Sequence, residues 1–278
     1  MKKQPKPADR ATAYALAVVS GKILAGPYVR GACQRHLNDL QDAGKRGFYY
    51  DDHVAAEAIA FFEECLCLNG GQYEGKPFKL FPWEAFIIGS LFGWLRKRDK
   101  MRRFRVAFVE TPKGSGKSPL CAGIGLKGLV ADDEARAEIY AAATFRDQAM
   151  ILFRDAVAFY DQSPELQARL VASGVGAMRW NLAYLDKGSF FRVISSEKKG
   201  QSGPRPHMAL LDEIHEHTDG TIIELLRAGF KFRRQPLSFM ITNSGHDKTS
   251  VCWEYHDLGA KVACEQVQND EFFSYICS

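Results

Sequence analysis

The chain has 278 residues, enough for one large α/β domain or two modest ones, and its 46% hydrophobic and 25% charged content is typical of a globular protein. A net charge of +4 permits contact with a polyanion but is too small to indicate a dedicated nucleic-acid-binding module. No window approaches the roughly 18 consecutive apolar residues of a membrane span. The seven cysteines lack zinc-ligand spacing, which predicts reduced thiols in a cytoplasmic protein.

Residues 1–75 predict an N-terminal helical subdomain. Apolar side chains recur at helical spacing in three windows, at 11–20, 33–43 and 51–67. The segment Asn69-Gly70-Gly71 ends the last of these helices. After a turn at Gly75-Lys76-Pro77, a further helix is expected from Phe81 to about Arg96.

Beyond residue 100, short β-type runs alternate with helical patterns. The expected strands are 104–110, 138–144, 190–195, 208–211 and 237–242. The expected helices are 119–130, 147–160 and 221–230. This alternation predicts an α/β fold whose mostly parallel central sheet is flanked by helices on both faces.

The pattern divides the chain into three parts. We expect a helical segment at 1–75, an α/β core at 76–262 and a final stretch at 263–278. This stretch contains a β-type run, 272–276, after which the sequence stops without a turn or cap. We therefore expect 263–278 to be a linker or the start of a further domain, and the chain to be part of a longer protein.

A glycine-rich segment joins the first core strand to the next helix: Thr111-Pro112-Lys113-Gly114-Ser115-Gly116-Lys117-Ser118. A phosphate-binding loop needs inward-facing N–H groups followed by a helix N-terminus, and Gly114 and Gly116 supply the backbone freedom. Lys117 would reach the β- and γ-phosphates of a nucleotide, and Ser118 would hold Mg²⁺. The usual pattern has Gly where Thr111 stands, and the alternative interpretation is a Gly-Ser turn beside a surface lysine. With a strand before it and a helix after it, the whole segment is predicted to bind phosphates.

Two adjacent carboxylates follow the apolar run 208–211. This is the end of a strand, where open parallel sheets bind ligands. Asp212 is predicted to bind the Mg²⁺ ion that also contacts Ser118, and Glu213 to orient an attacking water. The alternative is an acidic N-cap for the next helix. His215 and His217 lack a nearby third ligand, so we expect them to pack or support rather than bind a metal.

Other polar residues are weaker candidates. Thr242 and Asn243, after the fifth strand, can hydrogen-bond a γ-phosphate, but a polar exit from the strand explains them equally well. Lys113 in the loop and Arg146 after the second strand are candidate catalytic cations, and the 231–234 basic cluster is a candidate for in-trans or DNA-backbone contacts. Surface charge is the alternative for each of them.

These residues together resemble the ATPase half of a tailed-bacteriophage terminase large subunit, the motor that packages DNA into a procapsid. Segment 110–118 resembles its Walker A motif, which typically lacks the first glycine, and 211–217 resembles its Walker B motif with the catalytic glutamate. Segment 81–84 is similar to its adenine-side motif, which makes Trp83 and Glu84 implied nucleotide contacts, with Glu84 where the family commonly has Gln. Segments 141–149 and 241–245 resemble the stretch after its second strand and its coupling motif.

The resemblance implies an ASCE-type P-loop NTPase that uses Mg²⁺ and ATP and couples hydrolysis to translocation of double-stranded DNA. It implies partnership with a portal protein and a small terminase subunit, no membrane, and location in the cytoplasm of the infected host cell. It implies a homo-oligomeric ring when active, in which each subunit completes its neighbour's site with a basic residue. A monomer in isolation should therefore hydrolyse ATP slowly. The nuclease domain of such proteins would begin where this sequence stops, so no nuclease activity is expected.

Two other functions stay open. One is another nucleic-acid motor such as a helicase, which usually needs a second recA-like domain. The other is a nucleotide-gated assembly or docking module that binds ATP without productive hydrolysis.

Overall fold

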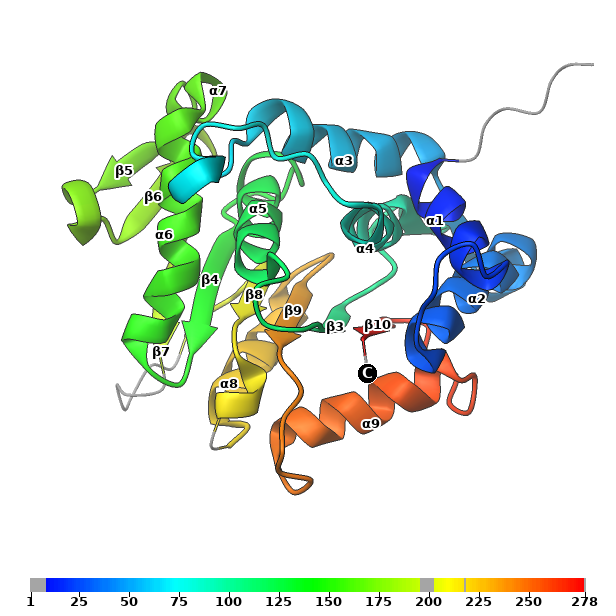
Figure 1. Ribbon diagram of the computed structural model, residues 1–278. Coiled ribbons are helices and arrows are strands. Elements are labelled where there is room, and N and C mark those ends of the chain that lie inside the picture. Colours follow the sequence, from blue (N-terminus) through cyan, green and yellow to red (C-terminus); the bar gives the residue numbers. More distant parts are fainter. Residues whose placement is uncertain (1–8, 196–202, 218, 278) are drawn as a thin grey trace, which may run out of the picture.

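The computed structural model describes residues 9–195, 203–217 and 219–277 and places a twisted eight-stranded sheet at the centre of the molecule (Figure 1). The strand order is β10-β3-β9-β8-β4-β7-β6-β5, in which β10 through β7 pair in parallel and β6 and β5 are added antiparallel. The strands are β3 (Val106–Glu110), β4 (Glu138–Ala143), β5 (Val171–Ser173), β6 (Asn181–Tyr184), β7 (Ser189–Ser195), β8 (Met208–Leu211), β9 (Leu237–Thr242) and β10 (Phe272–Ile276). A separate antiparallel pair joins β1 (Phe48–Tyr50) to β2 (Trp94–Arg96).

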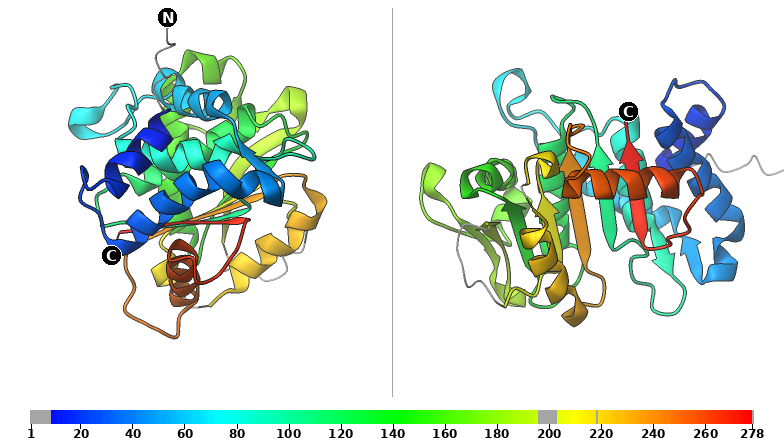
Figure 2. Two further views of the ribbon diagram at one scale, coloured as in Figure 1. Left: turned by 90° about the vertical axis from the view of Figure 1, so that its right-hand side faces the viewer. Right: turned by 90° about the horizontal axis from the view of Figure 1, so that it is seen from below.

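Helices cover both faces of the sheet (Figure 2). The described helices are α1 (Arg10–Val19), α2 (Pro27–Asp42), α3 (Asp52–Cys65), α4 (Pro82–Gly93), α5 (Lys117–Val130), α6 (Arg146–Gln162), α7 (Pro164–Gln167), α8 (Thr221–Gly229) and α9 (Val251–Ala263). Helices α5 and α6 share one apolar core with α1 to α4, and α8 and α9 cover the opposite face with a second core. None of the helices in the described ranges is long and apolar enough to cross a bilayer.

Helix α5 packs tightly on the sheet through glycines on its inner face. A Cβ atom at Gly125 would lie 2.6 Å from Leu210 Cδ1 and 2.8 Å from Phe191 Cε1. A Cβ atom at Gly128 would lie 2.4 Å from Met208 Sδ. The loop before α5 is therefore held close to the ends of the central strands.

A buried ion network attaches the N-terminal helices to the sheet. Arg103, whose side chain is fully buried, donates to Asp39 of α2 over 2.7 Å and to Asp270 before β10 over 2.6 Å. The same guanidinium lies 5.1 Å from the ring centre of Trp94. The N-terminal helices and the sheet consequently form one packed body.

The five predicted core strands and the three helices between them are present, with ends shifted by up to two residues. The stretch 263–278, expected as a linker or the start of a further domain, contains β10, which pairs in parallel with β3 from Phe272↔Val106 to Ile276↔Glu110. The β-type run predicted at 272–276 thus forms a strand of the central sheet, with its side chains buried. The helix expected to reach Arg96 instead ends at Gly93, since Trp94–Arg96 pairs with β1.

Candidate nucleotide-binding site at the carboxyl edge of the sheet

The glycine-rich segment forms an open loop between β3 and α5. Gly114 and Gly116 have φ angles of +80° and +91°, a region that side-chain-bearing residues seldom adopt. Nothing lies within 4 Å of where a Cβ of Gly114 would be, so the loop tip faces open space. The first N–H groups of the 14-residue helix α5 have no intrahelical partners and carry the positive end of the helix dipole. The loop therefore has the form of an anion cradle.

Polar side chains from the start of α5 and from the ends of β9 and β8 converge beside this loop. Lys117 Nζ donates to Asn243 Oδ1 over 2.6 Å, and Asn243 Nδ2 donates to Glu213 Oε2 over 3.3 Å. Ser118 Oγ donates to Asp212 Oδ2 over 3.4 Å. Because β3, β9 and β8 are adjacent and parallel, their carboxyl ends meet at one edge. The predicted phosphate loop and acidic pair therefore lie together.

Asp212 is a buried carboxylate, with only 5% of its surface exposed. Burial, reinforced by the neighbouring Glu213 charge, raises the pKa of Asp212 to about 6, while Lys117 and Ser118 act in the opposite direction. The Asp212 carboxylate and the Ser118 hydroxyl are hard oxygen donors of the kind that Mg²⁺ prefers. A bound cation would offset the unfavourable burial, so these residues fit the metal.

Glu213 holds a strained backbone conformation, with φ +47° and ψ 54°. Such left-handed geometry in a residue with a side chain costs free energy and is found preferentially at functional sites. The Glu213 N–H donates to Asp212 Oδ1 over 2.8 Å, which helps to fix this turn. The turn directs the Glu213 carboxylate toward Asn243 at the end of β9.

The two histidines after the acidic pair hold its backbone in place through hydrogen bonds. Burial lowers the pKa of His217, and its Nε2 donates to the Asp212 carbonyl oxygen over 3.0 Å. The backbone N–H of His215 donates to Thr242 Oγ1 over 3.1 Å, which ties the acidic turn to β9. Thr242 is fully buried and donates in turn to the Asn243 carbonyl over 2.8 Å. Both histidines therefore position the turn.

The other loop residues have distinct surroundings. Thr111, in the place of the usual glycine, is buried, and its hydroxyl lies 2.8 Å from the Ser115 hydroxyl. Its N–H donates to the Thr242 carbonyl over 3.1 Å and so extends the β3–β9 pairing into the loop. Pro112 and Lys113 are exposed at the loop tip, where the Lys113 side chain is accessible to a ligand.

Trp83 and Glu84 lie at the start of α4. Glu84 Oε2 accepts a 2.7 Å hydrogen bond from the Phe81 N–H, which caps the helix. Only 1% of Glu84 is exposed, and burial raises its pKa to about 7. Its Oε1 would lie 3.4 Å from a Cβ on Gly116, so Glu84 packs directly beneath the loop. Trp83 stacks on Tyr275, with ring centres 5.9 Å apart.

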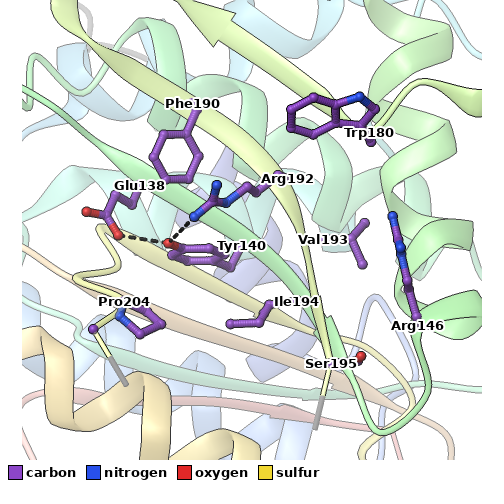
Figure 3. Close-up of a pocket in the computed structure, with 11 residues that line it drawn as sticks. Glu138, Tyr140, Arg146, Trp180, Phe190, Arg192, Val193, Ile194, Ser195 and Pro204 are labelled. Atoms are coloured by element: carbon purple, nitrogen blue, oxygen red, sulfur yellow. Dashed lines mark hydrogen bonds between the residues drawn. The ribbon is translucent and has the colours of Figure 1, made fainter. Parts of the chain in front are cut away.

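Arg146 is the first residue of α6, which follows β4. It lines a cavity of about 550 Å³ beside β4 and β7, together with Trp180, Phe190 and Arg192 (Figure 3). The Arg192 guanidinium lies 4.3 Å from the centre of the Phe190 ring. Among the residues that the structure describes, none from 111–118 lines this cavity. The role of Arg146 at the nucleotide stays a prediction.

Sequence reasoning missed a buried carboxylate at the base of the loop. Glu110, 2% exposed, accepts from Ser244 Oγ over 2.9 Å, and its other oxygen lies 2.8 Å from His256 Nδ1 of α9. The available signal was a charged residue that ends an apolar strand directly before the phosphate loop. Its partners are remote in sequence and were not recognisable from local pattern.

The parallel sheet, the glycine-rich loop between strand and helix, and the acidic pair at a neighbouring strand end define a P-loop NTPase of the ASCE type. The family described as "Terminase large subunit, ATPase domain" matches residues 82–259, which is most of the chain. The chain therefore belongs to the terminase large subunit ATPase family of bacteriophages.

Particular relatives agree with this assignment. The chain is 29% identical over 114 residues to Protein YmfN of Escherichia coli strain K12, a match that spans 41% of this chain and 25% of that protein. It is 29% identical over 156 residues to the large terminase subunit of Enterobacteria phage HK97, a match that spans 56% of this chain and 29% of that protein. The crystal structure of the HK97 large terminase has the same fold, with a TM-score of 0.66 at 21% identity, over 80% of this chain and 43% of that one. The matches thus span under half the length of each relative.

Proposed function

We propose that this domain hydrolyses ATP with Mg²⁺ and couples the reaction to translocation of double-stranded DNA into a procapsid, in the cytoplasm of the infected host cell. The observation that carries the proposal is the 3.4 Å contact between Ser118 Oγ and Asp212 Oδ2, which joins the phosphate loop to the acidic pair. Membership of the terminase ATPase family supports the same activity.

The proposed roles follow from the positions of the side chains. The backbone N–H groups of 111–118 and the Lys117 ammonium bind the ATP phosphates. Ser118 and Asp212 hold Mg²⁺, which neutralises phosphate charge when bound. The Glu213 carboxylate orients water for in-line attack and accepts its proton. Lys113, exposed at the loop tip, is placed to stabilise charge on the transferred phosphoryl group.

Asn243 links the two halves of this site. Its side-chain amide oxygen accepts a hydrogen bond from Lys117 over 2.6 Å, and its amide nitrogen donates one to Glu213 over 3.3 Å. Phosphate binding by Lys117 competes with the first of these bonds. A bound nucleotide would therefore free the Asn243 amide oxygen. This supports Thr242 and Asn243 as the segment that senses the γ-phosphate.

The DNA-packaging part of the proposal rests on the family. We propose a ring of subunits around duplex DNA that docks on a portal protein and receives DNA from a small terminase subunit. Arg146 is exposed and lines a cavity that residues 111–118 do not line, which suits a contact with a neighbouring subunit or with DNA. Arg233 of the basic cluster donates instead to the carbonyls of Arg205 and Arg136, so it serves the fold of this chain.

Phosphate release tests the proposal. The purified chain with ATP and Mg²⁺ should release phosphate slowly, faster with linear duplex DNA and portal-bearing procapsids, and Lys117→Ala should abolish release. Displacement of a triplex-forming strand from the duplex would report translocation. Tight ATP binding with no release under any condition would favour a docking module, and separation of a forked duplex would favour a helicase.

A further inference from the structure

A chain of hydrogen bonds leads from Ser244, just after β9, through Glu110 to His256 in helix α9. The Ser244 hydroxyl donates to Glu110 Oε1 over 2.9 Å, and Glu110 Oε2 lies 2.8 Å from Nδ1 of His256. Ser244 is exposed at the nucleotide-binding edge, whereas the Glu110 side chain is only 3% exposed. One buried carboxylate thus joins a strand-end hydroxyl to a helix.

The backbone of Glu110 is held between the glycine-rich loop and the end of β10. It ends β3 and directly precedes Thr111, the first residue of the phosphate loop. Its carbonyl accepts the N–H of Cys277 over 2.9 Å, which extends the β3–β10 pairing. The Glu110 backbone therefore cannot move far, because it is part of the central sheet.

Two aromatic rings pack against His256, the α9 residue that contacts this carboxylate. The His256 ring stacks on the Trp253 ring, with centres 5.1 Å apart and planes 16° apart. Tyr28 of α2 meets His256 edge-on at 6.0 Å. A cavity of about 460 Å³ opens over Glu110, Ser244, Trp253 and His256, so these side chains have room to rearrange.

The far end of α9 is packed without such space. A Cβ atom at Gly259 would lie 2.9 Å from Ile276 Cδ1, and the Ser274 hydroxyl of β10 donates to the Gly259 carbonyl over 3.0 Å. A Cβ atom at Gly31 of α2 would lie 2.3 Å from the Ala263 carbonyl oxygen. A shift at the start of α9 would therefore be passed on to β10 and α2 rather than absorbed.

We propose that Glu110 and His256 are positioning residues that transmit the state of the nucleotide-binding edge, through Ser244, to helix α9. Release of Asn243 from Lys117 moves the adjoining Ser244, and Glu110 and His256 convert that movement into a shift of the first turns of α9. The inference rests on the proposed function, since it requires that Lys117 binds a nucleotide.

Trp253 is a natural reporter for this movement because its indole, whose emission depends on its surroundings, stacks on the His256 ring. Tryptophan fluorescence is followed as a non-hydrolysable ATP analogue and Mg²⁺ are added, and Trp253→Phe identifies the part of the signal that belongs to Trp253. Analogue affinity is measured separately by displacement of a fluorescent nucleotide. We expect wild type to show a Trp253-dependent change that Glu110→Gln and His256→Gln abolish, with analogue affinity kept within about twofold.

Two further variants complete the test. Ser244→Ala removes only an exposed hydroxyl, so it breaks the same chain without threatening the fold, and it should also abolish the Trp253 change. Glu254→Gln makes the same chemical change as Glu110→Gln at an exposed position of α9. This variant should leave the Trp253 fluorescence change intact. In turnover, Glu110→Gln should lower kcat by about tenfold with KM nearly unchanged, as expected for a lost charged hydrogen bond.

The outcomes separate the two levels of the proposal. A wild-type protein that binds the analogue without a Trp253-dependent change, or a change that survives in both Glu110→Gln and Ser244→Ala, would overturn the positioning role while leaving nucleotide binding in place. A wild-type protein that does not bind the analogue would overturn the proposed function and this inference with it.

Discussion

Two acidic side chains at the nucleotide-binding edge have environments that oppose their ionisation. Asp212 and Glu84 are 5% and 1% exposed, and burial raises their pKa values to about 6 and about 7. Burial of a charge costs free energy unless a partner compensates for it. Asp212 therefore weakens the fold, a pattern common at functional sites, and the proposed Mg²⁺ ion would compensate for its buried charge when bound.

Asp212→Asn should accordingly stabilise the metal-free protein at neutral pH. The folded pKa lies above the unfolded value near 4, so the protonated carboxyl contributes stability that is full below pH ~4 and is lost as the pH rises through 6. At pH 7.5 the variant should exceed wild type by about 2 kcal/mol in the free energy of unfolding. Urea denaturation without Mg²⁺ at pH 5 and 7.5 checks this. An advantage of equal size at both pH values would contradict the assignment.

At the scale of elements, the position of α5 determines the position of the phosphate loop. Its glycines allow a close approach to β7 and β8 that larger residues would prevent. The periodicity of the sequence predicted this helix, but not why its inner face is glycine. That reason appears only when Phe191 and Leu210 are seen against Gly125.

Gly125→Ala should destabilise the protein by about 1–3 kcal/mol, because the added methyl group meets the Phe191 ring and the Leu210 side chain in a packed core. It should also weaken ATP binding, since α5 and the loop must shift outward. Gly44→Ala is the matched control, as its methyl group would approach only the flexible Lys97 ammonium. Chemical denaturation of both variants measures the difference, and equal stabilities would disprove the packing account.

At the scale of the whole molecule, the N-terminal helices and the sheet depend on each other. Arg103 is fully buried between Asp39 and Asp270, so one guanidinium holds α2 against the segment before β10. Removal of one partner from a buried ion network is costly, because the remaining charges stay buried.

Arg103→Met should therefore reduce the free energy of unfolding by about 3 kcal/mol. Arg98→Met removes an arginine that is 74% exposed and 3.4 Å from Asp99, and should change it by less than about 0.5 kcal/mol. Thermal and urea denaturation of both variants provide the comparison. If the two substitutions cost the same, the buried network would not be what holds the N-terminal helices in place.

The sequence was informative where function depends on local pattern. Alternating strands and helices predicted the parallel core, and the spacing within 111–118 predicted the loop, because both are encoded by near neighbours. Pairing across the sheet was less accessible: the strand at 272–276 was recognised, but its place beside β3 depends on distant contacts. The Asn243 bridge and the Glu110–His256 pair were missed for the same reason. The roles of Trp83, Glu84 and Arg146 at the nucleotide stay predictions.

The central claim is that Glu213 aims water at a nucleotide held by the neighbouring loop. Phosphate release and nucleotide affinity measured together in Glu213→Gln test it most directly. The account predicts that turnover falls by roughly 100-fold or more, because a general base is lost, while ATP affinity stays within about threefold of wild type. Turnover close to wild type in this variant would contradict the claim.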